Sequence, residues 1–190
     1  VYHGKDGLQY IADHVHTSTT TLAKELNDLG FKQKNSAYFD TILVEVETDK
    51  LRPVAEANGV NFNYIDENHI SISVNETVGL KEINEIVDCF EQAFNIKDIL
   101  VTEFTTTDVI PADVKRATSF LDNDIFNTYQ SETDMMRYIK KLERKDLALN
   151  HSMISLGSCT MKLNAASEML PLSNPQWGNI HPFVPLNQAE

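Results

Sequence analysis

The sequence is poor in basic residues, in cysteine and in long apolar runs, and each shortage excludes a class of protein. Only 16 Lys and Arg stand against 28 Asp and Glu, a formal charge of −12. This net charge argues against nucleic acid as a partner, because neutralising phosphates requires clustered cations. No apolar run reaches about eighteen residues, so we expect no membrane-spanning helix. Two cysteines, Cys89 and Cys159, are too few for a disulfide framework and are typical of a reducing compartment.

The start of the chain also lacks the features of a complete or exported protein. Val1-Tyr2-His3-Gly4 has no initiator Met, no basic n-region and no apolar h-region. We therefore expect no signal peptide, and we expect the chain to be an internal part of a longer protein.

Three stretches within the first hundred residues carry the apolar spacing of amphipathic helices, and they cover residues 5–29, 49–58 and 79–94. The first has the longest apolar stripe, which consists of Leu8, Ile11, Ala12, Val15, Leu22, Leu26 and Leu29. Gly30 and Gly59 follow the first two stretches and indicate where these helices end.

Alternating apolar and polar residues predict three strands between and after the first two helices, at residues 39–46, 60–64 and 70–74. Asp66-Glu67-Asn68 supplies a turn between the second and third strands, which favours an antiparallel hairpin. The order α-β-α-β-β-α predicts an α+β fold, in which a small sheet carries helices on one face.

The pattern changes after Ile99. One more helix is predicted from Ser131, which resembles a capping box with Asp134, and its apolar face contains Met135, Tyr138, Ile139 and Leu142. From Leu149 onward four prolines forbid a long helix, and we expect no regular element except a helical turn at 164–169. Forty residues without structure are unusual in a compact domain. We therefore expect this tail to lie against a surface outside the chain.

The tail also contains the residues best suited to catalysis or ligand binding. Lys162, between Met161 and Leu163, is either a desolvated nucleophile or a solvated, phosphate-pairing lysine. Ser158 and Thr160 could donate to an anion, and Cys159 is more simply a packed thiol than a reactive one. His151 and His181 lack the short spacing of zinc ligands, so we expect no metal site.

The most specific feature of the chain is a series of motifs after residue 129. They are Tyr129-Gln130-Ser131-Glu132-Thr133, Met136-Arg137-Tyr138, Lys145-Asp146-Leu147, the run HSMISLGSCTMKLN from His151 to Asn164, and Asn179-Ile180-His181-Pro182-Phe183. Together with Tyr2-His3-Gly4 and Phe39-Asp40-Thr41, they closely resemble the glycine decarboxylase family, the P-proteins of the glycine cleavage system. The resemblance spans essentially the whole chain.

Proteins of this family are similar to two tandem copies of a fold-type-I pyridoxal-phosphate (PLP) enzyme. The resemblance implies that residues 1–104 are the small α+β domain of the first copy, 105–150 a helical connector, and 151–190 an extended arm of the next PLP-enzyme domain. It also implies that the full-length protein decarboxylates glycine with PLP as the electron sink. The aminomethyl group would then pass to the lipoyl arm of H-protein.

The sequence departs from the family in one respect that concerns catalysis. The family's PLP lysine lies in a His-Lys motif before a glycine-rich stretch, and no such motif occurs here. We therefore expect this chain to bind no PLP by itself, to contain no catalytic residue and to be inactive alone. In the full-length protein, the resemblance favours five residues as the lining of the substrate or cofactor pocket, namely Ser158, Thr160, Lys162, Asn164 and His181.

The resemblance also implies partners: lipoylated H-protein, the remainder of the P-protein or a partner subunit, and glycine as substrate. We expect a homo-oligomer, in the cytoplasm of a bacterium or the mitochondrion of a eukaryote, with neither nucleic acid nor membrane as partner. Two other interpretations stay open. The chain could be a structural or dimerisation module that exchanges its arm between copies. It could also be a regulatory α+β domain that binds a small ligand such as an amino acid.

Overall fold

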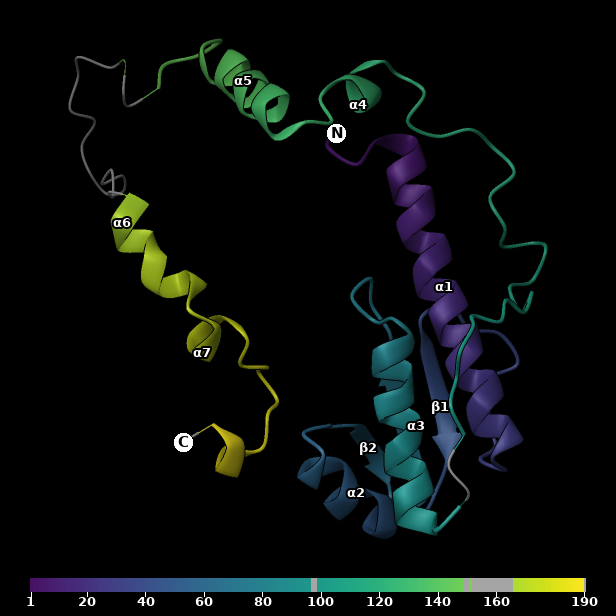
Figure 1. The fold of residues 1–190 in the computed structure, drawn as a ribbon. Helices are drawn as coiled ribbons and strands as arrows, with labels where there is room; N and C mark the ends of the chain where they lie inside the picture. The colour runs from purple at the N-terminus through teal and green to yellow at the C-terminus, as the bar shows by residue number, and fades with distance from the viewer. Residues whose placement is uncertain (97–98, 149–150, 152–165, 190) are drawn as a thin grey trace. The chain divides into compact units, whose positions relative to one another are not determined.

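The computed structural model describes residues 1–96, 99–148, 151 and 166–189 (Figure 1). The chain divides into two compact units, Val1–Thr128 and Tyr129–Glu190. The elements of the first unit are α1 (Gly4–Asp28), β1 (Thr41–Glu45), α2 (Thr48–Ala57), β2 (Asn63–Asp66), β3 (His69–Ser73), α3 (Leu80–Phe94) and α4 (Ile125–Thr128). This order confirms the predicted α-β-α-β-β-α arrangement and the α+β fold.

The three strands form an antiparallel sheet in the order β1-β3-β2. In the register of β1 and β3, Ile42 lies opposite Ile72 and Val44 opposite Ile70, and all four side chains are buried. The other face of the sheet is more polar: Leu43 lies there opposite Ser71, beside Thr41 and Ser73, whose hydroxyls are 2.9 Å apart. The sheet therefore needs an apolar cover on one face only.

Helices α1 and α3 lie across the apolar face, and α2 packs against α3 (Figure 1). The helical side chains buried there are Leu22 and Leu26 of α1, Leu51 and Ala55 of α2, and Ile83, Val87 and Phe90 of α3. The Phe90 ring meets Phe31 and Phe62 edge-on, with ring centroids 4.8 and 5.9 Å away. These helical apolar positions are the ones that the sequence pattern assigns to the core.

Helix α1 is longer than the sheet that it covers. Its 25 residues span about 37 Å, whereas a five-residue strand spans about 17 Å. Leu22 and Leu26 are fully buried, but Leu8, on the same predicted stripe, is 42% exposed. The apolar spacing therefore predicts the helix correctly over its whole length, whereas the core covers only its second half. Gly30, with φ of +95°, ends the helix as predicted.

Residues 99–107, here called the crossing segment, run back over α3 and α1 without forming a regular element (Figure 1). On α3, the Asn84 side chain accepts a hydrogen bond from the Val101 amide at 2.8 Å and donates to the Val101 carbonyl at 3.0 Å. The buried Glu91 carboxylate accepts from the Ile99 amide at 2.7 Å. Side chains of α3 thus replace the backbone partners that a strand would provide.

Four consecutive hydroxyl residues of α1, Ser18 to Thr21, are buried. Thr21 Oγ1 accepts from the Thr105 amide at 2.8 Å, and Thr20 Oγ1 donates to the Thr105 carbonyl at 2.8 Å. Thr20 and Thr21 lie on the side of α1 opposite Leu22 and Leu26, by helical spacing. Helix α1 is therefore buried on two sides, by the apolar core and by the crossing segment.

The chain then returns to the beginning of α1. Asn127, in α4, accepts a hydrogen bond from the Lys5 amide at 3.2 Å, although no side chain of the α1 N-terminus itself caps that end. Lys5 Nζ also lies 3.4 Å from Asp122 Oδ1. Because the first amides of a helix have no partner within the helix, α4 satisfies a group that α1 leaves open.

The second unit contains α5 (Glu132–Glu143), α6 (Ala166–Met169), the 3-10 helix η1 (Leu170–Ser173), α7 (Pro175–Gly178) and the 3-10 helix η2 (Leu186–Gln188). Ser131 begins α5 as predicted, since its hydroxyl accepts from the Asp134 amide at 3.1 Å. None of the described side chains of this unit is buried. The unit therefore has no apolar core among the residues that the structure describes.

The prediction of a single helical turn after Leu149 was wrong in extent, because the structure adds η1, α7 and η2 to the turn at 166–169. Pro171 and Pro175 occupy the first or second positions of η1 and α7. Proline prevents a long helix, but its fixed φ and missing N–H suit the first turn of a short one.

The attachment of the crossing segment generates a stability prediction. Replacing Thr21 with Val removes the acceptor of the Thr105 amide, so we expect the free energy of unfolding to fall by about 1 to 3 kcal/mol. Urea unfolding and amide hydrogen exchange at Thr105 measure the effect. Thr19→Val is the matched control, because Thr19 is equally buried but its hydroxyl donates only to Val15 in the same helix. Equal losses in both variants would contradict the attachment.

Candidate functional site

Of the five residues predicted to line a pocket, His181 alone lies among the described residues. Ser158, Thr160, Lys162 and Asn164 fall within residues 152–165, outside the described residues. His181 is exposed, and its Nδ1 accepts a hydrogen bond from the Phe183 amide at 3.1 Å. A neutral imidazole that accepts at Nδ1 carries its proton on Nε2, so His181 can donate from Nε2.

The turn before His181 is built from local hydrogen bonds. Asn174 Oδ1 accepts from the Gln176 amide at 3.0 Å and caps α7, which Pro175 begins. Trp177 and Phe183 remain 70% and 89% exposed. The segment from α7 to η2 therefore presents a histidine and several apolar side chains without covering them.

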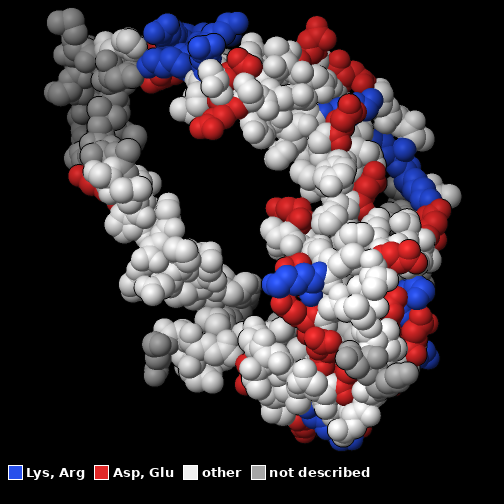
Figure 2. All heavy atoms as spheres, viewed as in Figure 1, with Lys and Arg blue, Asp and Glu red and all other residues white. Residues whose placement is uncertain are grey.

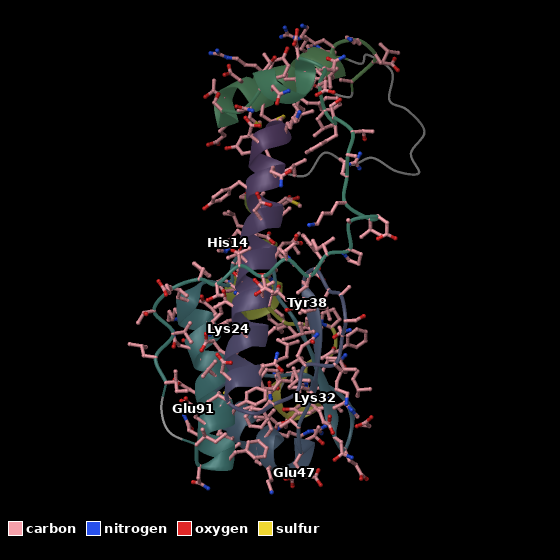
Figure 3. All side chains as sticks on the ribbon, turned by 90° about the vertical axis from the view of Figure 1, so that its right-hand side faces the viewer. His14, Lys24, Lys32, Tyr38, Glu47 and Glu91 are labelled. Carbon is pink, nitrogen blue, oxygen red and sulfur yellow. The ribbon has the colours of Figure 1, made fainter. Side chains whose placement is uncertain are left out.

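Two surface cavities lie among the described residues of the first unit. Figure 3 labels Tyr38 and Lys24 of one cavity above Lys32 and Glu47 of the other. The first measures about 320 Å³ and lies between the second half of α1, the loop that contains Tyr38, and Thr107. Lys24 lines it, and its Nζ donates to Asp28 at 2.8 Å and to Glu25 at 3.1 Å. These carboxylates, Asp28 first, raise the pKa of Lys24 above its ordinary value.

The second cavity measures about 520 Å³ and is lined by Lys32, Glu45 and Glu47, among others. Lys34 bonds Glu45 at 2.8 Å, which lowers the pKa of that carboxyl, and Lys50 lies 2.8 Å from Glu47. Both carboxylates therefore have a lysine partner at the rim of the cavity.

Neither cavity fits PLP. That cofactor needs an amine able to lose its proton and a cradle for a phosphate dianion. In the first cavity the Asp28 and Glu25 carboxylates raise the pKa of Lys24, which disfavours the neutral amine. The second cavity is lined by two carboxylates, Glu45 and Glu47, and a single lysine, Lys32, which is a poor cradle for a dianion.

Three further candidates occupy structural positions. The His14 ring meets Phe104 edge-on at 5.9 Å, and His16 Nδ1 lies 2.9 Å from the Phe39 carbonyl, so these two histidines contact different segments. Cys89 is fully buried, and burial raises the pKa of its thiol. Across the residues that the structure describes, no His, Cys, Asp and Glu side chains gather in a group able to hold a metal ion.

The sequence analysis did not predict that Ser and Thr residues of α1 hold the crossing segment in place. The sequence does carry a signal, since five consecutive Ser and Thr residues interrupt the apolar pattern of α1 at positions 17–21. Among the described residues, no helix combines the length and apolarity needed to cross a bilayer.

The described structure is thus a small α+β domain followed by a unit of short helices. Comparison with known proteins gives the family. Residues 1–90 match the model "Glycine cleavage system P-protein". The whole chain is 57% identical to the glycine dehydrogenase (decarboxylating) of Flavobacterium johnsoniae, 56% to that of Christiangramia forsetii and 44% to that of Saccharophagus degradans. The chain belongs to the P-protein family of the glycine cleavage system, and it spans 20% of the length of these relatives.

The ion pairs of Lys24 generate a prediction about its reactivity. Asp28→Asn removes the largest cause of the raised pKa, so more of the Lys24 amine is neutral near pH 9 and acylation speeds up by about two- to fivefold, as for a surface ion pair. Acylation followed by peptide mass spectrometry measures the rate. Asp6→Asn, about 27 Å away along α1, is the control and leaves the rate unchanged. An unchanged rate in Asp28→Asn would refute the pairing.

Proposed function

We propose that the chain is a segment of a glycine dehydrogenase (decarboxylating), the P-protein of the glycine cleavage system. The observation that carries this proposal is the 57% identity over the whole chain to a relative with that name. We assign residues 1–104 to the small α+β domain of a first PLP-enzyme copy, 105–150 to a helical connector, and 151–190 to an arm of the next PLP-enzyme domain.

In the full-length protein, the proposed reaction removes the carboxylate of glycine as CO₂ and transfers the aminomethyl group to the lipoyl arm of H-protein. PLP would supply the electron sink for the decarboxylation. Ser158, Thr160, Lys162, Asn164 and His181 would line the substrate or cofactor pocket, where a histidine Nε2–H and a carboxamide are suitable donors to a carboxylate or phosphate.

The 190-residue chain alone is proposed to be inactive. The two cavities of the first unit are unsuited to PLP, and the His-Lys motif of the family is absent from the sequence. The lysine that holds PLP would come from the remainder of the P-protein or from a partner subunit. We also propose a homo-oligomeric protein of the bacterial cytoplasm, since the similar relatives named above come from bacteria. A eukaryotic counterpart would lie in the mitochondrion.

Reductive trapping tests where the cofactor lysine lies. Treating the 190-residue chain with PLP and borohydride is expected to give only scattered, low-level labelling. The full-length protein is expected to take up one equivalent on a lysine outside these residues. Intact mass and peptide mapping measure both. Lys162→Gln in the 190-residue chain is the control and leaves the total nearly unchanged. Stoichiometric labelling at Lys162 alone would overturn the proposal.

Substitution in the full-length protein tests the pocket residues. Asn164→Ala and His181→Ala are each expected to lower kcat/KM for glycine by about 10- to 100-fold, the loss that misplacing a bound substrate causes. Steady-state CO₂ release with lipoylated H-protein measures the change. Gln176→Ala removes an exposed side chain five positions before His181 and should have no effect. If all three variants keep full activity, these residues lie away from the pocket.

A further inference from the structure

We propose that the apolar face of α5 docks into an apolar groove on the part of the same polypeptide that lies outside these 190 residues. We call this face, made of Met135, Met136, Tyr138, Ile139 and Leu142, the α5 stripe. The inference rests on the proposed function only in taking the chain as a segment of the longer P-protein. It adds a contact surface and the kind of surface that covers it.

The α5 stripe is a continuous apolar face of the kind that helices normally bury. Its members stand at i, i+1, i+3, i+4 and i+7, which places them on one side of the helix. Met136 is 62%, Ile139 52% and Leu142 42% exposed. In α3, residues with the same kind of spacing, such as Ile83, Val87 and Phe90, are almost completely buried. Helix α5 thus carries a core-type face without a core.

The opposite side of α5 is strongly basic. Residues 137–145 contain five Lys or Arg and one Glu, and Figure 2 shows the blue surface gathered over this helix. Arg137, Lys140, Lys141 and Arg144 lie opposite the stripe by helical spacing, and Lys140 pairs with Glu143. Burying these cations without partners would cost much more than exposing them. The helix therefore docks through one face and keeps the other in water.

Helix α5 also needs external support in order to persist. Isolated helices of fewer than about 12 to 15 residues are marginal in water, and α5 has 12. Its local support comes from the Ser131 cap, from the ion pair of Lys140 with Glu143, and from the Tyr129 ring, which stacks on Tyr138 with centroids 4.2 Å apart. Methionine side chains, two of which belong to the stripe, adapt readily to the shape of a groove.

The length of the relatives identifies the occupant. In three curated relatives, the segment that matches this chain, α5 included, makes up 20% of one continuous polypeptide. The other four-fifths are therefore covalently attached to α5 and present at an effective concentration in the millimolar range. A second copy at micromolar concentration is a much weaker competitor. A helix inserted in an apolar groove is a common way to bury such a stripe.

Hydrogen exchange on the full-length protein tests the docking. We expect the α5 amides to exchange at least about 100-fold more slowly than in a synthetic peptide of residues 129–148, because docking holds the helix formed. Exchange as fast as in the peptide would overturn the proposal. Measuring glycine decarboxylation on the same sample separates the two claims, because an active protein with unprotected α5 refutes the docking alone. An inactive wild-type protein with protected α5 refutes the proposed function alone.

Variants on the two sides of α5 test whether the α5 stripe is the face that docks. Ile139→Gln and Leu142→Gln, singly and together, keep a good helix former but remove apolar contact, so the double variant should raise the exchange rates at least about tenfold. Lys141→Gln and Arg137→Gln on the basic side should change them less than about twofold. The single Ile139→Gln variant decides the question if the double variant does not fold. Equal effects on both sides of the helix would overturn the assignment.

Cross-linking shows whether the surface that covers the α5 stripe belongs to the same polypeptide or to a second copy. Lys140 and Lys141 carry primary amines, so a mixture of ¹⁴N- and ¹⁵N-labelled full-length copies can be cross-linked and mapped. Cross-links from these lysines to residues beyond the 190, within peptides of one label, support the same polypeptide as occupant. Mixed-label pairs that disappear in Ile139→Gln would assign the stripe to a second copy and overturn the proposal.

Discussion

The burial of one face of a three-stranded sheet is the constraint on which the first unit depends. Strands of four and five residues are too short to be stable without a cover, and Ile42, Val44, Ile70 and Ile72 need burial on one side of the sheet. Helices α1 and α3 supply that cover and are thereby fixed in position. Once fixed, they present a second surface, and the crossing segment uses their Asn84, Thr20 and Thr21 side chains as hydrogen-bonding partners.

The two units differ in whether their amphipathic elements bury their apolar side chains. In the first, each amphipathic element finds an apolar partner within about ninety residues of sequence. In the second, the amphipathic helix α5 and the short helices after it bury none of their described side chains. The difference lies in the availability of a partner surface, since the apolar spacing of α5 is as regular as that of α3.

Apolar periodicity predicted the elements and most of the core, since helices and strands with one buried face repeat at 3.6 and 2 residues. Leu8 shows its limit, because periodicity identifies a face without saying how far the opposing sheet extends. The bonds from Thr20 and Thr21 to Thr105 were not predicted, because hydrogen bonds across more than eighty residues leave no periodic trace. The pocket residues came from the family motif alone, and four of them lie outside the described residues.

The link between Lys5 and Asn127 has a consequence for biosynthesis. The first turn of α1 leaves the ribosome well before the carboxamide that completes it, which is encoded 122 residues later. At about 5 to 20 residues per second, the interval is about 6 to 24 seconds. During that time α1 can pair with the nascent sheet while its beginning and its hydroxyl-bearing side stay open to water. Translation speed through this region therefore sets how long an unfinished helix is exposed to chaperones and proteases.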